Sequence, residues 1–167
     1  FRIFDALNDL RNMKVPIETV KKVGAHAQGS LCYTISPVHT VEYYVETFKK
    51  LEEMGCDSLY LKDMAGMVSP SKAYKIIHAC KEAVKVPVGL HSHTTSGMTM
   101  LSYMKACEAG VDILDCAMSP ISGGAGHPPT ESIVAALKDS PYDTGYDLEL
   151  LMECRRYFLK VWEKYGH

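Results

Sequence analysis

The sequence lacks the features that mark several classes of protein. None of its apolar runs approaches the roughly 20 residues that a membrane-spanning helix needs. It has no basic excess, because 18 basic and 20 acidic side chains give a formal net charge of −2. It also has no low-complexity tract, and 47% of its 167 residues are hydrophobic. These absences exclude direct membrane insertion, nucleic-acid binding and disorder, and they indicate a globular protein.

Disulfide signals are missing as well. The six cysteines include no CxxC pair, and no secretory leader precedes them. Most stand in apolar patterns beside Leu, Ile or Ala, which indicates buried free thiols in a reducing compartment. We therefore expect a cytoplasmic protein. The chain begins at Phe1 without an initiator Met, so we also expect a fragment of a longer protein.

Short strand-like segments alternate with longer amphipathic segments along the whole sequence. The strand candidates begin about 25–29 residues apart, a spacing typical of repeated βα units, and they are residues 2–4, 30–34, 58–61, 86–91 and 113–116. The helix candidates are residues 40–54, a segment that begins at Ser69-Pro70, and residues 98–108, 129–138 and 147–164. A Ser-Pro pair is typical of a helix start, and we expect that helix to bury Tyr74, Ile77 and Cys80.

This alternation predicts a parallel α/β sheet, either doubly wound or closed into a (β/α)₈ barrel. The glycine-rich run at residues 122–126 comes late and does not match G-x-G-x-x-G, so the dinucleotide-binding fingerprint is missing and the barrel is favoured. A complete barrel has about 250 residues. We therefore predict an incomplete (β/α)₈ TIM barrel, about the last five βα units, over residues 1–143. Residues 144–167 are predicted to form a C-terminal helix that packs on the barrel or leaves it, with these side chains facing inward: Leu150, Leu151, Cys154, Phe158, Val161 and Trp162.

Polar side chains follow the predicted strands at their C-terminal ends, where chemistry collects in a βα barrel. They are Asp5, Asn8, Thr34, Ser36, Lys62, Asp63, His91, Ser92, His93 and Asp115. His91 and His93 stand at i and i+2, so both project from one face of a strand and form a possible pair of metal ligands. The alternative is that each is an ordinary hydrogen-bonded histidine.

Lys62 closes the strand that precedes the histidine strand. An ammonium group at a barrel strand end is costly to desolvate, so it should be paired, neutral or modified. One interpretation is a salt bridge with a local carboxylate such as Asp63. The other is a carbamate formed with CO₂, which would give a neighbouring metal ion an anionic oxygen ligand.

Five segments in the same order resemble the carboxyltransferase domain of biotin-dependent enzymes. They are FRIFDALND (residues 1–9), YTISPVHT (33–40), KDMAG (62–66), LHSHTTSG (90–97) and GHPPTES (126–132). The family includes the oxaloacetate decarboxylase α subunit, the pyruvate-binding subunit of transcarboxylase, and pyruvate carboxylase. Each segment alone is a weak signal, whereas the ordered set covers nearly the whole chain.

The resemblance implies a divalent metal ion at the mouth of the barrel, with the family's carboxylated lysine on Lys62 and its histidine ligands on His91 and His93. It also implies that the fourth ligand, an aspartate, lies upstream of this chain together with an arginine and a glutamine that hold the keto acid. Pyruvate carboxylases have a catalytic threonine where this sequence has Ala125, which places the sequence closer to the decarboxylase and transcarboxylase branch.

Two further residues are expected near substrate or biotin, namely Ser122 and His127. The alternative for His127 is a histidine at a helix start that bonds to the backbone. The implied metal is Zn²⁺, Co²⁺ or Mn²⁺, because ligand type alone does not choose among them. The implied partners are oxaloacetate or pyruvate, a biotin carboxyl carrier domain, and further copies of the protein in a homo-oligomer.

The resemblance therefore implies metal-dependent carboxyl transfer between oxaloacetate or pyruvate and biotin, of the oxaloacetate decarboxylase or transcarboxylase type. Three alternatives stay open. One is the carboxyltransferase subunit of a pyruvate carboxylase. Another is a Claisen lyase similar to hydroxymethylglutaryl-CoA lyase, against which Lys62 within KDMAG argues. The last is an inactive partial-barrel fragment.

Overall fold

The computed structural model describes residues 1–166, which contain five strands and six helices. The strands are β1 (Arg2–Asp5), β2 (Gln28–Cys32), β3 (Ser58–Asp63), β4 (Val88–Ser92) and β5 (Ile113–Leu114). The helices are α1 (Leu10–Lys22), α2 (Val41–Glu53), α3 (Pro70–Ala83), α4 (Thr99–Glu108), α5 (Thr130–Leu137) and α6 (Leu148–Tyr165). Strand and helix alternate through β5, which confirms the predicted series of βα units.

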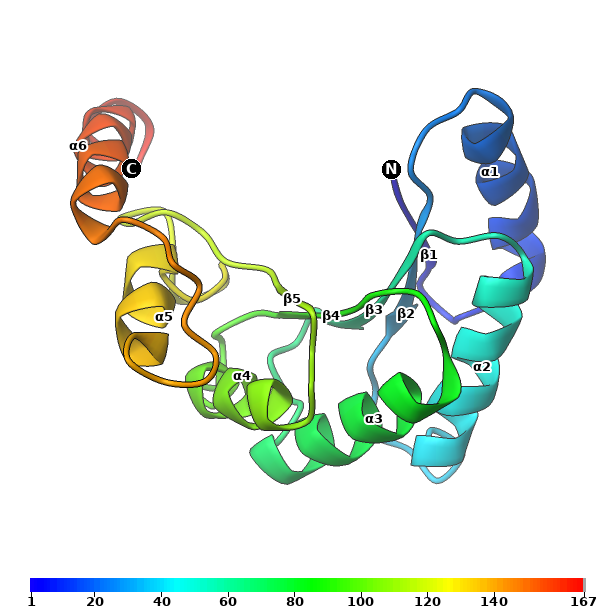
Figure 1. Ribbon diagram of the computed structural model, residues 1–167. Coiled ribbons are helices and arrows are strands. Elements are labelled where there is room, and N and C mark those ends of the chain that lie inside the picture. Colours follow the sequence, from blue (N-terminus) through cyan, green and yellow to red (C-terminus); the bar gives the residue numbers. More distant parts are fainter. Residues whose placement is uncertain (167) are drawn as a thin grey trace.

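The five strands form one parallel sheet in the order β1-β2-β3-β4-β5. Each strand thus pairs with the next strand of the sequence, as in the wall of a barrel. Helices α1 to α4 lie along the convex side of the curved sheet, and no helix within residues 1–166 covers the concave side (Figure 1). A doubly wound sheet carries helices on both faces, so this arrangement excludes that alternative.

The hydrophobic core lies between the sheet and these outer helices. In β3, Leu59 and Leu61 are fully buried and belong to the same apolar cluster as Phe48 of α2 and Ile77 of α3. Burying each such side chain contributes about 1.5–3 kcal/mol. Because side chains alternate along a strand, the residues between these leucines point to the concave face, where the strand ends carry polar groups.

Three helices begin where a side-chain oxygen caps the first free N–H groups. Thr40 accepts from Tyr43 N at α2, and Ser69 accepts from Lys72 N at α3, as the sequence predicts. Asp147 caps α6 in the same way. Helix α1 contains a proline in its interior and no acidic residue in its first turn, which explains why its limits are difficult to read from sequence.

Some predicted boundaries and burials are wrong in detail. Strand β2 begins two residues earlier than expected, and β5 has only two residues. Tyr74 is 37% exposed because the buried side of α3 instead contains Ala73 and Ile76 together with the expected Ile77 and Cys80. The helix is therefore rotated slightly from the predicted orientation.

The C-terminal helix α6 packs against α5 at the end of the arc (Figure 1). None of its residues from Leu148 to Tyr165 is buried, so the expected inward face is wrong. Leu150 is 59% exposed and Trp162 45% exposed, because α6 meets only one side of the described fold. The predicted segment 144–167 also includes His167, which lies outside the described residues.

All six cysteines are free, as expected, although Cys154 on α6 is exposed and Cys116 is half-buried. The other four thiols are buried. None of the helices in residues 1–166 is both long and apolar enough to cross a membrane.

Candidate metal centre

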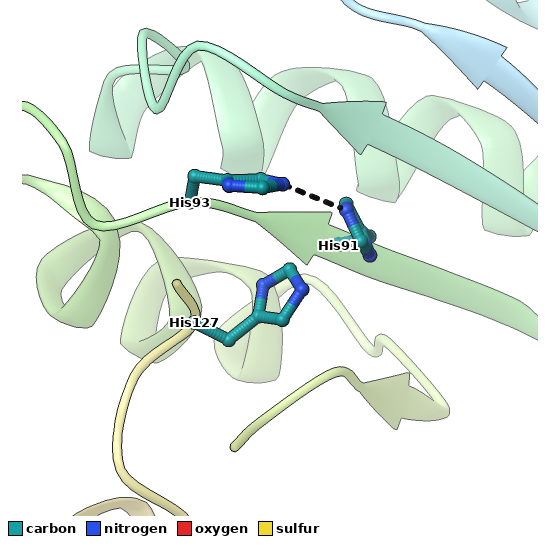
Figure 2. A group of neighbouring side chains, drawn as sticks. All are labelled: His91, His93 and His127. Carbon is teal, nitrogen blue, oxygen red and sulfur yellow. Dashed lines mark hydrogen bonds between the residues drawn. The ribbon is translucent and has the colours of Figure 1, made fainter. Parts of the chain in front are cut away.

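Three histidines converge at the C-terminal edge of the sheet. His91 lies in β4, His93 follows directly after it, and His127 comes from the loop that precedes α5. The three rings point toward one another from these two segments, as Figure 2 shows. Their potential ligand atoms all lie within 4.8 Å of one another. The i, i+2 spacing thus brings the first two together as predicted, and the third arrives through the fold.

The separation of two of these nitrogen atoms fits a shared metal ion. The Nε2 atoms of His91 and His93 are 3.3 Å apart. Two ligands of a tetrahedral zinc ion, with Zn–N distances of about 2.0–2.1 Å, stand about 3.3 Å from each other. Two imidazole lone pairs at this distance repel each other unless a proton or a cation lies between them. The donor set therefore fits a divalent ion.

Hydrogen bonds on the far side of two rings leave their Nε2 atoms free to bind a metal. His127 Nδ1 lies 2.9 Å from the carbonyl oxygen of Ser92, and His93 Nδ1 contacts the carbonyl oxygen of Ala125. A carbonyl oxygen only accepts, so each Nδ1 carries the proton and donates it. Metal-binding histidines in proteins are held by the same kind of support.

A glycine-rich turn places His127 in this cluster. Gly123 and Gly124 have φ angles of 80° and 51°, a left-handed conformation that favours glycine. The turn is closed by Gly126 N, which donates to the Gly123 carbonyl at 2.7 Å, and it is tied to the β4 end by Thr94 N, which donates to the Gly126 carbonyl at 2.9 Å. The glycine run is thus a turn that aims a histidine. The alternative for His127, a backbone-bonded histidine before a helix, describes only its Nδ1.

His91 is the most enclosed of the three histidines, with 7% of its surface exposed. Burial lowers the pKa of its imidazole, and the nearby His127 and Lys62 lower it further, while a hydrogen bond with Asp115 acts in the opposite direction. The net effect favours the neutral ring, which is the form that binds a metal. His91 Nδ1 lies 2.7 Å from Asp115 Oδ2 and 2.8 Å from a guanidinium nitrogen of Arg2.

Lys62 lies beside His91 in the register of β3 and β4 and is only 8% exposed. Within residues 1–166 its ammonium forms no ion pair, and the Nζ atom lies 4.7 Å from the centre of the Phe4 ring. Burial lowers the pKa of Lys62, which favours the neutral amine.

The alternative salt bridge between Lys62 and Asp63 is wrong. Successive residues of a strand point to opposite faces, so these two side chains diverge. The Asp63 carboxylate is fully buried on the helix side, where it accepts from Val68 N at 2.8 Å, Met67 N at 3.0 Å and Ser92 Oγ at 2.8 Å. Asp63 therefore orders the loop after β3, and Lys62 is left without it.

The other strand-end residues support loops. Asn8 exchanges hydrogen bonds with the backbone of Cys32, and Asp5 accepts from Leu7 N and Asp9 N. Further polar contacts occupy the predicted substrate loop, where Ser122 Oγ is 3.3 Å from Ser119 Oγ. In the described part of the chain Ser122 has no hydrogen bond to the three histidines.

Sequence reasoning missed the role of Arg2 and named Asp115 only as a strand-end residue. The one signal for Arg2 was a charged residue in the body of an otherwise apolar strand. Its partners lie up to 113 positions away in the sequence, so the contact becomes visible only in the folded sheet.

Comparison with known proteins agrees with this geometry. The model of the HMGL-like family matches residues 5–157. The chain belongs to the HMGL-like family. One of the two subunits named for pyruvate carboxylase in methanogens, that of Methanocaldococcus jannaschii, is 59% identical over 99% of this chain, which covers 29% of that protein. A methylmalonyl-CoA carboxyltransferase 5S subunit of Propionibacterium freudenreichii subsp. shermanii is 50% identical over 99% of the chain and is covered over 33% of its length.

A solved structure gives the corresponding fold. The carboxyl transferase domain of Rhizobium etli pyruvate carboxylase, solved with pyruvate and biocytin, superposes with a TM-score of 0.94 and 34% sequence identity. The superposition covers 97% of this chain and 28% of that one. These comparisons confirm the resemblance and show that the chain forms part of a TIM-barrel domain. The chain spans about a third or less of the length of these relatives.

Proposed function

We propose that the protein containing this chain catalyses metal-dependent carboxyl transfer between oxaloacetate or pyruvate and biotin on a carrier domain. The observation that carries the proposal is the convergence of His91, His93 and His127 at the C-terminal edge of a partial TIM barrel. Support comes from relatives named for carboxylation and carboxyl transfer, and from a 34% identical domain solved with pyruvate and biocytin.

In this proposal His91 and His93 bind the ion through Nε2, and His127 stands beside it to contact the keto acid, with Ser122 in the same loop. A divalent ion bound there, Zn²⁺, Co²⁺ or Mn²⁺, supplies a Lewis acid that stabilises negative charge on the keto oxygen. The neutral histidines hold their lone pairs ready because backbone carbonyls bind the opposite nitrogen atoms of His93 and His127. The protein thus fixes the donors before any ligand arrives.

Lys62 is proposed to supply an anionic ligand as a carbamate. Its neutral amine attacks CO₂, a nitrogen–carbon bond forms, and one proton is released to solvent, which leaves a negatively charged carboxylate on the side chain. Three observations support this reaction: the burial of Lys62, the lack of an ion pair within residues 1–166, and a pKa lowered by desolvation. An unmodified ammonium beside His91 would repel the cation.

The test uses the full-length protein and measures bound metal together with oxaloacetate decarboxylation and biotin-dependent carboxyl exchange. His91→Ala and Lys62→Ala should each abolish carboxyl transfer while leaving the fold in place. His78→Ala is a matched control, because His78 lies exposed on α3 and stacks only on Tyr74. Near-normal turnover in either site variant would contradict the proposal.

The family match also keeps a Claisen-type cleavage of an acyl-CoA as a second candidate. An acyl-CoA cleavage assay separates the two activities directly. The relatives include proteins named for pyruvate carboxylation and for carboxyl transfer, so comparing pyruvate with oxaloacetate as carboxyl acceptor and donor shows which direction dominates. The proposal includes a cytoplasmic homo-oligomer, which size-exclusion chromatography with light scattering and cell fractionation would test.

A further inference from the structure

A chain of polar side chains on one face of the sheet links all five strands to the metal centre. Arg2 of β1 donates from Nε to Gln28 of β2, and its guanidinium carbon lies 4.5 Å from the centre of the Tyr60 ring in β3. A terminal nitrogen of Arg2 lies 2.5 Å from Asp115 Oδ2, directly after β5, and 2.8 Å from His91 Nδ1 in β4. Arg2 is therefore held in place from three sides before it reaches the histidine.

The sheet is shaped to admit this arrangement. Gly89 precedes His91 by two positions on the same face of β4, and it pairs with Tyr60 in the register of β3 and β4. A Cβ atom on Gly89 would lie 2.5 Å from the Tyr60 ring. The missing side chain thus lets the ring lie across β4, where it supports the guanidinium group of Arg2.

The two neighbours of His91 Nδ1 make incompatible demands on it. A guanidinium group only donates hydrogen bonds, and an ionised carboxylate only accepts them. If Nδ1 carries the proton, it donates to Asp115, and the Nε2 lone pair faces His93. If Nδ1 is unprotonated, it accepts from Arg2, and Nε2 then carries the proton toward His93 Nε2, 3.3 Å away (Figure 2).

We propose that Asp115 is a positioning residue that selects the metal-binding tautomer of His91, and that Arg2 stabilises the competing tautomer when no ion is bound. The inference rests on the metal centre of the proposed function and adds a coupling between ion binding and the Arg2–Asp115 pair. Ion binding requires a free Nε2 lone pair, so it shifts the Nδ1 proton toward Asp115 and ends the hydrogen bond from Arg2. Each residue thus favours one of two states.

Asp115 is suited to accept this proton donor at neutral pH. Burial raises its pKa, but hydrogen bonds from His91 and Arg2 outweigh that effect and lower the pKa to about 2. The carboxylate is therefore ionised, and Arg2 remains paired with it in both states through the 2.5 Å contact.

The experiment measures Zn²⁺ affinity of the full-length protein by chelator competition, and the His91 tautomer by solid-state NMR of ring-¹⁵N histidine with and without Zn²⁺. A His91→Gln sample assigns the signals by subtraction. Asp115→Asn should weaken Zn²⁺ binding about 10–100-fold and leave His91 protonated on Nε2 in the metal-free protein. Arg2→Met should keep or tighten Zn²⁺ binding and move the proton to Nδ1.

Asp112→Asn is the matched control. Asp112 lies three positions before Asp115, at the other end of β5, and binds Lys81 and Val88 N. It should leave both the Zn²⁺ affinity and the tautomer unchanged.

The opposite effects of the Asp115 and Arg2 variants separate positioning from general destabilisation. Equal losses of affinity in Asp115→Asn and Arg2→Met, or wild-type affinity in Asp115→Asn, would overturn the positioning role and leave the proposed function intact. Wild-type protein that binds no Zn²⁺ would overturn both. If Asp115→Asn does not fold, the wild-type spectra decide: a His91 proton that stays on the same nitrogen when Zn²⁺ is added contradicts the proposal.

Discussion

Helices α3 and α6 are both amphipathic, yet the structure uses them differently. Helix α3 packs against α2, α4 and β4 and buries four residues, including Ile77 and Cys80 at no measurable exposure. Helix α6 packs against α5 and has no buried residue between Leu148 and Tyr165. Periodicity therefore predicts that a segment is helical, whereas the neighbours that the fold supplies decide how much of its apolar side is buried.

The difference extends to the candidate site. The β3–β4 region that α3 supports contains Lys62 and His91, and it is fully buried along both strands. Geometry of the kind that a metal requires needs such rigid support. Helix α6 carries several exposed apolar residues and no member of the histidine cluster. We therefore expect α3 and the strands to control stability and metal binding together, and α6 to affect neither strongly within residues 1–166.

Truncating one apolar residue in each helix should show the largest contrast. Ile77→Ala should lower the free energy of unfolding by about 2–5 kcal/mol, because it leaves a cavity in a closely packed core. Leu150→Ala, at a side chain that is 59% exposed, should change it by less than about 0.5 kcal/mol. Urea denaturation of the full-length protein measures both values. Equal effects would show that α6 is buried against parts of the protein outside this chain.

Overpacking at Gly89 should be the next largest effect. A methyl group there meets the Tyr60 ring at 2.5 Å, so Gly89→Ala should cost about 1–3 kcal/mol of stability. It should also weaken Zn²⁺ binding, because the displaced ring supports Arg2 beside His91. Tyr60→Leu combined with Gly89→Ala should recover part of the stability. A thermal unfolding series with the two single variants and the double variant measures this coupling, and strict additivity would contradict it.

These contrasts also show how much the sequence could predict. The repeat length and the strand-end position of His91 and His93 depend on short-range periodicity, and both features appear in the structure. Pairing Lys62 with Asp63 was a wrong alternative, because the alternation of strand side chains separates consecutive residues. Local rules were sufficient where the deciding contacts are local.

Other features depend on contacts between distant segments. His127 reaches the cluster through a glycine turn that ties to the end of β4, and Arg2 meets Asp115 across 113 positions. Neither contact has a periodic signal in a single sequence. The inward face predicted for α6 failed for a related reason, because an apolar stripe does not specify a partner. Family resemblance supplied the metal-site expectation, but the supporting contacts required the fold.

Acid titration should give a smaller effect that is confined to the sheet. The pKa of Asp115 is about 2 in the folded protein, below its ordinary value of 3.8, so its ionised form stabilises the fold. That contribution, about 2 kcal/mol, is fully present above pH 4 and is lost as the pH falls toward 2. The pH dependence of unfolding should therefore be shallower in Asp115→Asn than in wild type between these values. Identical slopes would show that Arg2 and His91 do not hold the carboxylate.

Removing one cap from each helix should give the smallest effects and the sharpest comparison. Ser69 caps α3 and Asp147 caps α6, and loss of such a side chain costs about 1 kcal/mol. Because α3 is joined to the core, Ser69→Ala should lower the stability of the whole sheet. Because α6 is exposed along its length, Asp147→Ala should release only α6 locally. Hydrogen exchange separates the two outcomes: faster exchange in β4 after Asp147→Ala would mean that α6 unfolds together with the core, and the contrast between the helices would then fail.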